Sequence, residues 1–351
     1  MDPIRVAVVG CGEIAQVMHL PYLAELPEFE LAAISDLSPA LLEQVGDRFG
    51  VPLRSHDYAD VLDSVDAVAI LTHDHGDIAE EAARRGKHLF VEKPLGYSIE
   101  ECDRVIAAAR ASGVKLMVGY MRRFDPGYVY ALEQIAALGR VRFVRAHDFG
   151  GSFAIHPAVY SLGRPHDVPA SVMEAGEQRI NERMRAALGA DHEHLVDAYY
   201  GTLMSGIHDL AMLRGLLGSP AGIIHSELVG ESGLVTLLDY GAGCVCSFEQ
   251  ALMTDYAWWD QHLSVYADSG IVSIDLPNPY IRNAPTTVRV QRSDGDSPAT
   301  TSVPVSHDSP FRREWMHFAD CIRNDRAPLT NADDARADVE IAVAMLRAVR
   351  T

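Results

Sequence analysis

The sequence predicts an α/β domain built on a parallel sheet, followed by an α+β domain with a large, mostly antiparallel sheet. In residues 4–120, short β-branched runs alternate with helical stretches, a pattern typical of parallel sheets with helical crossovers. In residues 141–290, period-two runs are separated by turn residues, as hairpins require. We therefore expect domains at 1–124 and 125–351, with the C-terminal helix free to pack back on the first domain.

The composition is that of a packed globular protein of about two domains. The chain has 351 residues, of which 48% are apolar and 23% charged, in the ordinary range for such proteins. Its formal net charge of -19 argues against broad affinity for nucleic acid or an anionic membrane. No apolar run approaches the ~20 residues of a membrane span, and no signal peptide precedes the first strand.

The cysteines and histidines predict neither disulfides nor a metal site. The five cysteines are scattered without a C-x-x-C pair, and none of the fifteen histidines completes a zinc-ligand spacing with them. An odd, scattered set of cysteines favours reduced thiols. We therefore expect a cytoplasmic protein with no metal, no nucleic-acid partner and no membrane partner.

A glycine-rich turn follows the first strand directly. Residues 4–9 are a β-branched run, and Gly10, Gly12 and Ala15 follow in G-x-G-x-x-A spacing at the start of a helix. Gly10 allows the tight turn, Gly12 lets a pyrophosphate approach the backbone, and Ala15 lets the helix pack closely on the strand. A strand before and a helix after supply the context that this motif needs to indicate a dinucleotide site.

An acid ends the second strand. Residues 31–35 are followed by Asp36, and then by Leu37, Ser38 and Pro39 rather than an arginine. A carboxylate here can accept a hydrogen bond from a ribose 2′-hydroxyl, whereas an arginine would hold a 2′-phosphate. The pattern favours NAD over NADP. The alternative is that Asp36 merely neighbours a helix cap, since Ser38 and Pro39 form a helix start signal.

The alternation continues through three further strands and two helices. They are expected at 67–71 (strand), 77–85 (helix), 87–91 (strand), 98–112 (helix, opened by a capping box at Ser98) and 115–120 (strand).

The strand at 87–91 ends in Glu92, Lys93 and Pro94. The carboxyl ends of strands in an open α/β sheet face the crevice where such sheets bind ligands. Partial burial there lowers the pKa of an ammonium, which makes a lysine useful for proton transfer. The X-Pro bond can be held cis at small cost. The alternative is a strand end closed by a solvated Glu-Lys pair.

With these elements in place, the sequence resembles the glucose–fructose oxidoreductase / inositol dehydrogenase (Gfo/Idh/MocA) family. The matching stretches are 9–15, 71–72, 86–95 and 119–126. The resemblance implies a Rossmann domain, then a domain whose sheet commonly forms a homo-dimer or homo-tetramer. It implies an NAD(P)-dependent oxidoreductase acting on a secondary alcohol or ketone of a sugar, cyclitol or glycoside.

Spacing and resemblance together assign the site residues. The cofactor-binding residues are Gly10, Gly12, Glu13, Ile14, Asp36, Leu71, Thr72, His75, Glu92, Lys93, Met121 and Arg122. The substrate-binding residues are Lys93, Tyr120, Arg123, Tyr200 and His208, of which Lys93 and His208 are assigned as catalytic. Tyr200 would offer its hydroxyl only if the chain bends before the helix that carries His208.

One position departs from the family pattern. The family usually has an aspartate and a histidine four residues apart on a helix, but here Met204 precedes His208. Asp197 lies eleven residues before His208, roughly 16 Å along a helix, which is too far to replace the acid. Ser205 could orient the ring of His208 but is no base. Lys93 then becomes the main proton-transfer residue, and a structural role for His208 remains the alternative.

The remaining segments of the sequence give less specific predictions of structure and function. Residues 151–198 are predicted to be an insertion, with a loop and then a polar helix from about 170 to 188. The segment could shape a binding pocket, form an oligomer contact or act as a mobile lid. Trp258 and Trp259 fit a sugar contact, an interface or the core. Further strands are expected at 141–147, 234–240, 244–249, 262–266, 271–274 and 287–290, and helices at 311–323 and 332–348.

Two other functions share the same motifs. The first is a redox-neutral enzyme that uses bound NAD for transient oxidation, with elimination, glycoside cleavage or epimerisation as the net reaction. The second is a non-catalytic protein that binds NAD as a structural or sensory ligand.

Overall fold

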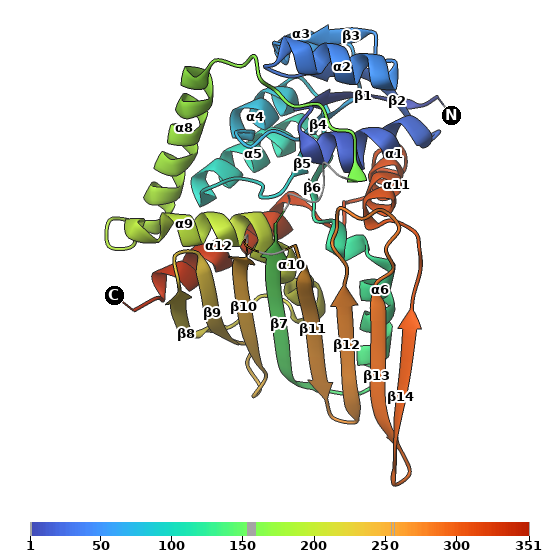
Figure 1. Ribbon diagram of the computed structural model, residues 1–351, viewed down its shortest axis with the longest axis vertical. Helices are drawn as coiled ribbons and strands as arrows, with labels where there is room; N and C mark the ends of the chain where they lie inside the picture. The colour runs from blue at the N-terminus through green and yellow to red at the C-terminus, as the bar shows by residue number, and fades with distance from the viewer. Residues whose placement is uncertain (1, 153–158, 254, 256, 351) are drawn as a thin grey trace. The chain divides into compact units, whose positions relative to one another are not determined.

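The computed structural model describes residues 2–152, 159–253, 255 and 257–350. The chain divides into two compact units (Figure 1). The first comprises Met1–Gly119, Pro157–Ala187 and Phe311–Val339, and the second comprises Tyr120–His156, Leu188–Pro310 and Glu340–Thr351. Each unit therefore draws on three segments of the chain, whereas the sequence pattern suggested two consecutive domains meeting at residue 124.

The first unit contains a six-stranded parallel sheet. Its strands are β1 (Ile4–Val9), β2 (Phe29–Ser35), β3 (Leu53–Ser55), β4 (Ala67–Ile70), β5 (His88–Glu92) and β6 (Leu116–Gly119). Their order is β3-β2-β1-β4-β5-β6, with every neighbouring pair parallel. The predicted doubly wound sheet is confirmed. The order reverses between β1 and β4, and such a switch point is where open α/β sheets bind their ligands.

The helices of the first unit begin largely where the capping signals predict. They are α1 (Leu20–Glu25), α2 (Pro39–Phe49), α3 (Ala59–Leu62), α4 (Gly76–Arg84), α5 (Ile99–Ser112), most of α8 (Ala170–Leu188) and α11 (Pro310–Arg323), and a π-helical turn at Ala15–His19 precedes α1. The hydroxyls of Ser38 and Ser98 accept the backbone N–H groups of Leu41 and Glu101, both at 3.1 Å. These bonds satisfy donors that a helix start leaves open.

Helix α11 belongs to the first unit because of its aromatic face. Trp315 and Phe318 are fully buried. The Trp315 ring stacks on Phe90 of β5 with centroids 4.2 Å apart, and Phe318 meets the same ring edge-on. Burying each of these side chains contributes on the order of 2–3 kcal/mol, which accounts for the return of a C-terminal helix to an N-terminal sheet.

The second unit contains the predicted large, mostly antiparallel sheet. Its strands are β7 (Val141–Gly151), β8 (Gly222–Val229), β9 (Gly233–Asp239), β10 (Val245–Met253), β11 (Asp260–Ala267), β12 (Gly270–Leu276), β13 (Thr287–Asp294) and β14 (Ser297–Pro304). The order is β14-β13-β12-β11-β7-β10-β9-β8, and only the β7–β10 pair is parallel. The two edge strands β8 and β14 escaped prediction, since both are largely exposed and lack a clean apolar alternation.

Helices cover one face of this sheet. They are α6 (Pro126–Ala136), α9 (Val196–Gly201) and α10 (Ile207–Leu217), and α12 (Ala332–Arg347) is divided between the units. A π-helical segment, Thr202–Gly206, joins α9 to α10. Along β7, Val144, Ala146 and Asp148 are buried, whereas Arg145 is exposed. Among the described residues no helix is long and apolar enough to span a membrane.

Candidate functional site

The glycine loop has the geometry that a dinucleotide requires. Gly10 has a φ of +94°, and a Cβ there would lie 2.9 Å from Leu71 C and from the Thr72 Cγ2 atom, so only glycine fits between β1 and β4. At Gly12 a Cβ would meet nothing within 4 Å. The backbone is therefore open on this side, as the close approach of a pyrophosphate needs. The adjoining Glu13 and Ile14 lie in the first turn after the loop.

Asp36 faces this loop from the end of β2. Its Oδ2 accepts the Cys11 N–H at 2.8 Å, and its Oδ1 accepts the Ser38 N–H at 2.9 Å. The carboxylate thus lies beside the glycine loop, as a ribose-binding acid must. Its hydrogen bond to Ser38 also shows that the capping alternative is partly right, because Asp36 helps to order the start of α2.

The loop after β4 is connected to the loop after β5 through one buried ring. His75 Nδ1 lies 3.0 Å from the Thr72 carbonyl oxygen, and its Nε2 lies 3.2 Å from the Leu95 carbonyl oxygen. The ring is 2% exposed. His75, predicted to bind the cofactor, therefore connects the loop after β4 with the loop after β5, while Leu71 and Thr72 pack against Gly10.

Glu92 and Lys93 lie at the carboxyl end of β5, where the motif was expected to place them. The bond between Lys93 and Pro94 is cis, a form that an X-Pro bond adopts at small cost. Glu92 is 9% exposed; its Oε2 accepts the Lys93 N–H at 3.1 Å, and its Oε1 lies 2.9 Å from His19 Nε2. Lys93 is half-buried, so its ammonium is partly shielded from water but still accessible.

A hydrogen-bonded chain orients Glu92. The indole N–H of Trp315 donates to His19 Nδ1 at 3.1 Å. A neutral imidazole carries only one N–H, so this bond leaves the ring proton on Nε2, from which it is donated to Glu92. His19, Glu92 and Glu314 have potential metal-ligand atoms within 4.8 Å of one another. His19 Nε2 carries a proton and donates it to Glu92, so this nitrogen has no lone pair to offer a metal. We therefore interpret the cluster as a pair of neighbouring carboxyl groups, Glu92 and Glu314, and not as a metal site.

Glu314 is the neutral member of that cluster. It is fully buried, and among the described residues neither of its oxygens has a hydrogen-bond partner. Burial, reinforced by the nearby Glu92, raises the pKa of Glu314 well above its usual value of 4.5. A protonated Glu314 avoids two adjacent buried negative charges, which low-dielectric surroundings penalise strongly.

The Glu314→Gln variant should therefore remove a pH dependence of stability. A carboxyl whose pKa is raised on folding stabilises the fold at low pH, and this contribution is lost as pH rises above 4.5 toward the raised value. The loss is about 1.4 kcal/mol for each pH unit over which only the folded form holds the proton. Urea unfolding at pH 5 and pH 8 should show a smaller drop for the variant than for wild type; equal drops would contradict the assignment.

In the second unit, Tyr120 and His208 form an edge-to-face pair with ring centroids 6.2 Å apart. Tyr120 follows β6, and His208 lies in the first turn of α10. The π-helical segment just before α10 contains Met204 and Ser205. Such π-helical insertions are frequent at functional sites, where they change which side chains share a helix face. The two aromatic side chains assigned to the substrate thus lie together.

Next to this pair is a buried polar core that the sequence did not predict, formed by Arg122, Asp148, Ser205, Asp209 and Gln261. The Nη2 of Arg122 donates to Gln261 Oε1 at 2.6 Å and to the Pro277 carbonyl at 2.7 Å. Gln261 in turn donates to Asp209 Oδ2 at 2.8 Å. The resemblance predicts that Arg122 contacts the cofactor. In the structure its guanidinium forms hydrogen bonds with residues of the second unit.

The two aspartates of the buried polar core share a proton. Asp148 and Asp209 are both fully buried and interact electrostatically with each other, and among the described residues the Oδ1 atom of each has no hydrogen-bond donor. Burial raises both pKa values, and the neighbouring Asp148 charge raises that of Asp209 further, whereas Ser205 and Arg122 oppose the rise at Asp148. The proton therefore resides on Asp209. Ser205, which the sequence suggested could orient His208, donates to Asp148 at 2.6 Å.

The other assigned residues are placed as follows. Arg123 donates to the Ala211 carbonyl oxygen at 3.1 Å, which ties it to α10. Met121 is buried, whereas Tyr200, at the end of α9, is 36% exposed. Trp258 is 73% exposed and so does not belong to the core.

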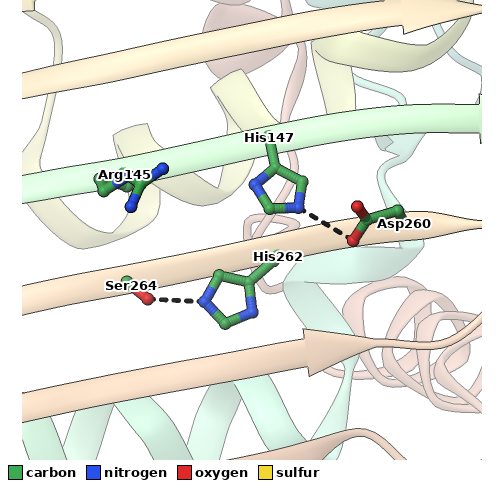
Figure 2. Close-up of a pocket in the computed structure, with 5 residues that line it drawn as sticks. All are labelled: Arg145, His147, Asp260, His262 and Ser264. Carbon is green, nitrogen blue, oxygen red and sulfur yellow. Dashed lines mark hydrogen bonds and ion pairs between the residues drawn. The ribbon is translucent and has the colours of Figure 1, made fainter.

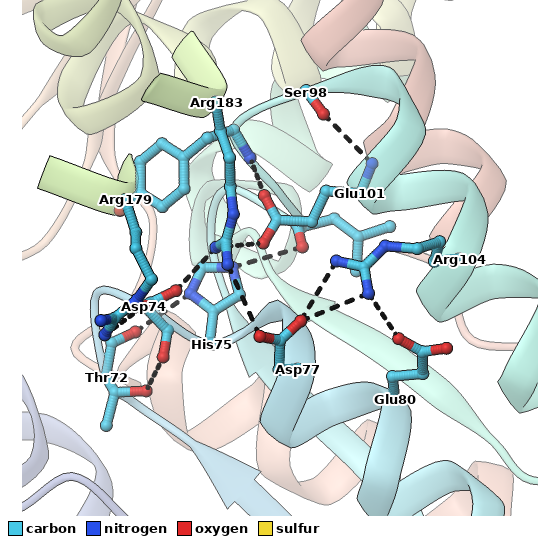
Figure 3. A network of polar contacts seen from close by, with 12 residues as sticks. Thr72, Asp74, His75, Asp77, Glu80, Ser98, Glu101, Arg104, Arg179 and Arg183 are labelled. Carbon is cyan, nitrogen blue, oxygen red and sulfur yellow. Dashed lines mark hydrogen bonds and ion pairs between the residues drawn. The ribbon is translucent and has the colours of Figure 1, made fainter. Parts of the chain in front are cut away.

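Residues 159–187, part of the segment predicted to be an insertion and here called the strap, belong to the first unit. Arg179 and Arg183 of α8 pair with Asp74 at 2.9 and 2.6 Å, and Arg183 also reaches Glu101 at 2.8 Å (Figure 3). Asp74 belongs to the loop that carries Thr72 and His75. The polar helix predicted at 170–188 is confirmed as α8, and its arginines fix the loop after β4.

A shallow pocket lies elsewhere in the second unit, on the exposed face of the sheet (Figure 2). It is lined by Arg145, His147, Asp260, His262 and Ser264. His147 bonds Asp260 at 2.9 Å, and His262 bonds Ser264 at 2.6 Å. The polar groups of this pocket are largely paired with one another, and nothing in it resembles the glycine loop or the Glu92–Lys93 motif.

The fold and the glycine loop together define a dinucleotide-dependent oxidoreductase. A family model described as "Oxidoreductase family, NAD-binding Rossmann fold" (GFO_IDH_MocA) matches residues 4–120. An inositol 2-dehydrogenase of Salmonella paratyphi B is 32% identical over 261 residues, covering 67% of this chain and 74% of that protein. The chain belongs to the Gfo/Idh/MocA family.

Full-length similarities agree with this membership. The scyllo-inositol 2-dehydrogenase (NAD(+)) of Bacillus subtilis is 26% identical over 99% of this chain and 94% of that protein. The crystal structure of an aldose-aldose oxidoreductase from Caulobacter crescentus, complexed with glycerol, has a TM-score of 0.76 at 26% identity and covers 99% of this chain and 98% of that one. The similarity therefore extends through both units.

Proposed function

We propose that the protein is an NAD-dependent dehydrogenase that oxidises a secondary alcohol of a sugar, cyclitol or glycoside, or reduces the corresponding ketone. The observation that carries the proposal is the placement of Glu92 and Lys93 at the carboxyl end of β5, in the same unit as a glycine loop open at Gly12. Relatives named for inositol and aldose substrates support the substrate class.

The residues that would hold the cofactor fit NAD. The open backbone at Gly12 would take the pyrophosphate, and the Asp36 carboxylate would accept the ribose hydroxyls. When bound, the nicotinamide would take up the hydride from the substrate carbon or return it. Glu92, held by His19, would border this part of the site.

Lys93 would move the proton. During oxidation its amine accepts the proton of the substrate hydroxyl, and during reduction its ammonium returns one, with His208 as the second hydrogen-bonding group. A lysine serves this purpose when partial burial brings its pKa toward the working pH, and Lys93 is half-buried. Met204 offers no carboxylate for His208, and the nearby acids Asp148 and Asp209 are used by each other and by Ser205 and Gln261.

A redox-neutral reaction with retained NAD is the second candidate, and the strap favours it. The strap contacts both the start of α2 and the loop after β4, which adjoin the predicted cofactor-binding residues Asp36, Thr72 and His75. A cofactor bordered in this way would exchange slowly with solvent.

One experiment separates the two candidates. A panel of sugars, inositols and glycosides is supplied with free NAD, and both NADH release and product are measured. Steady NADH formation on one class of polyol is the expected result. Product formation without NADH, by protein that keeps NAD through gel filtration, would instead support the redox-neutral reaction. Neither product nor NADH from any compound would contradict both.

We further propose that the protein works in the cytoplasm as a homo-dimer or homo-tetramer formed through the sheet of the second unit. The five cysteines are all free and buried, as suits a reducing compartment. The exposed sheet face carries half-buried aromatic side chains, among them Phe143 and Tyr266, whose rings lie 6.0 Å apart. Light scattering of the purified protein gives the oligomer size.

A further inference from the structure

The first part of the strap is fixed beside the glycine loop and α2. The Gln16 side chain makes a two-fold contact with Gly163, donating to its carbonyl at 3.0 Å and accepting its N–H at 2.8 Å. Gln16 is 1% exposed and also donates to the Cys11 carbonyl. A Cβ at Gly163 would lie 2.5 Å from Gln44 and 2.7 Å from Leu41 of α2. The strap therefore packs tightly here.

This contact brings Asp167 to the N-terminus of α2. Its Oδ1 accepts the hydroxyl of Ser38, and its Oδ2 accepts the Ala40 N–H at 2.9 Å. These two bonds, with the hydroxyl first, lower the pKa of Asp167, so the carboxylate is ionised at neutral pH. Ser38 donates a hydrogen bond to each of two carboxylates: its backbone N–H donates to Asp36 at 2.9 Å, and its hydroxyl donates to Asp167.

The position matters because it adjoins the predicted ribose site. NADP differs from NAD by a phosphate on the 2′ oxygen of the ribose that Asp36 is expected to bind. That phosphate adds a charge of about -1.5 to -2, and a free helix N-terminus is a site that attracts such a group. In this chain a carboxylate from a distant segment already uses the Ser38 hydroxyl and the Ala40 N–H.

We propose that Asp167 is a second determinant of cofactor specificity, which excludes NADP by placing a negative charge at the N-terminus of α2 beside Asp36. The inference rests on the proposed function in taking NAD as the cofactor. It differs from the assignment of Asp36, which the spacing after β2 already suggests, because Asp167 lies 129 residues from its partner Ser38. The strap also contains Arg164, which is exposed and whose positive charge would have the opposite effect on a phosphate.

Binding measurements with the purified full-length protein test the proposal. Dissociation constants for NAD and for NADP are measured for wild type, Asp167→Asn and Arg164→Ala. Asparagine keeps an oxygen for the Ala40 N–H but loses the charge. We expect Asp167→Asn to bind NADP about tenfold more tightly, with NAD affinity changed by less than about threefold. Asp63→Asn, which removes the same charge elsewhere on the first unit where Asp63 pairs with Arg85, should change neither affinity.

The binding measurements distinguish a failure of the Asp167 proposal from a failure of the proposed function. Unchanged NADP affinity in Asp167→Asn, or parallel weakening of both cofactors with a lowered melting temperature, would overturn the proposal, since Asp167 would then only anchor the strap. Arg164→Ala should weaken NADP binding relative to NAD, the opposite change to Asp167→Asn; a gain in NADP affinity in Arg164→Ala as large as that in Asp167→Asn would overturn the proposal, because both substitutions would then act by loosening the strap and not by charge. A wild type that prefers NADP would refute the cofactor in the proposed function; the Asp167 inference is judged separately, by the change between wild type and variant.

Discussion

The Lys93→Ala variant should lose about 10²- to 10⁴-fold in kcat/KM, the range typical of a removed general acid or base, while NAD still binds. Lys93 contributes a titratable nitrogen at the end of β5, and its backbone N–H already holds the Glu92 carboxylate. Truncating the side chain leaves that bond and the cis bond to Pro94 in place. Steady-state kinetics, together with NAD binding measured by calorimetry, give the two readouts.

Two further variants make this test specific. Lys93→Arg keeps the positive charge but cannot release a proton at neutral pH, so it should remain as inactive as the alanine variant. Lys87 lies just before the same strand and donates to the Val65 carbonyl at 2.9 Å, and Lys87→Ala should retain full activity. If Lys93→Ala keeps normal kcat, or if Lys93→Arg restores it, the proton is transferred by another group and the role of Lys93 is positional.

Local spacing explains which parts of the site could be predicted. The glycine loop, Asp36 and the Glu92–Lys93 pair each lie within a few residues of a strand end, so a parallel α/β alternation is enough to bring them to one edge of one sheet. Helix starts at Ser38 and Ser98 were predictable for the same reason, since a cap bonds to a backbone group three residues away. These features depend on short-range geometry alone.

The features that escaped prediction depend on partners distant in the sequence. Arg122 meets Gln261, 139 residues away, and Asp148 meets Ser205, 57 residues away. Asp167 reaches Ser38 across 129 residues. An arginine or aspartate is usually exposed, so nothing in the sequence near these residues signals burial or pairing. The return of α11 to the first unit likewise follows from the contact of Trp315 with Phe90, which only the folded chain displays.

The Arg122→Ala variant should lose about 3–5 kcal/mol of unfolding free energy, the cost typical of breaking a buried charge pair by removing one partner. Arg122 is 2% exposed, and its positive charge opposes the effect of burial on the pKa values of both Asp148 and Asp209. Without it, Gln261 and the Pro277 carbonyl lose a donor, and the aspartate pair loses the positive charge of Arg122 that offsets its own negative charge. The adjacent Arg123 is the matched control: it is half-buried and donates to the Ala211 carbonyl, so Arg123→Ala should cost about 1 kcal/mol, the net contribution of a typical hydrogen bond.

The loss should also depend on pH in a definite direction. Arg122 lowers the pKa values of Asp148 and Asp209 against the effect of burial, so its removal raises them further. A carboxyl whose pKa is raised on folding stabilises the fold below its unfolded pKa and loses that contribution as pH rises. The Arg122→Ala variant should therefore be destabilised more at pH 8 than at pH 5. Urea unfolding at both pH values measures the difference; a loss that is equal at the two, or no larger than that of Arg123→Ala, would show that Arg122 acts by packing and not by charge.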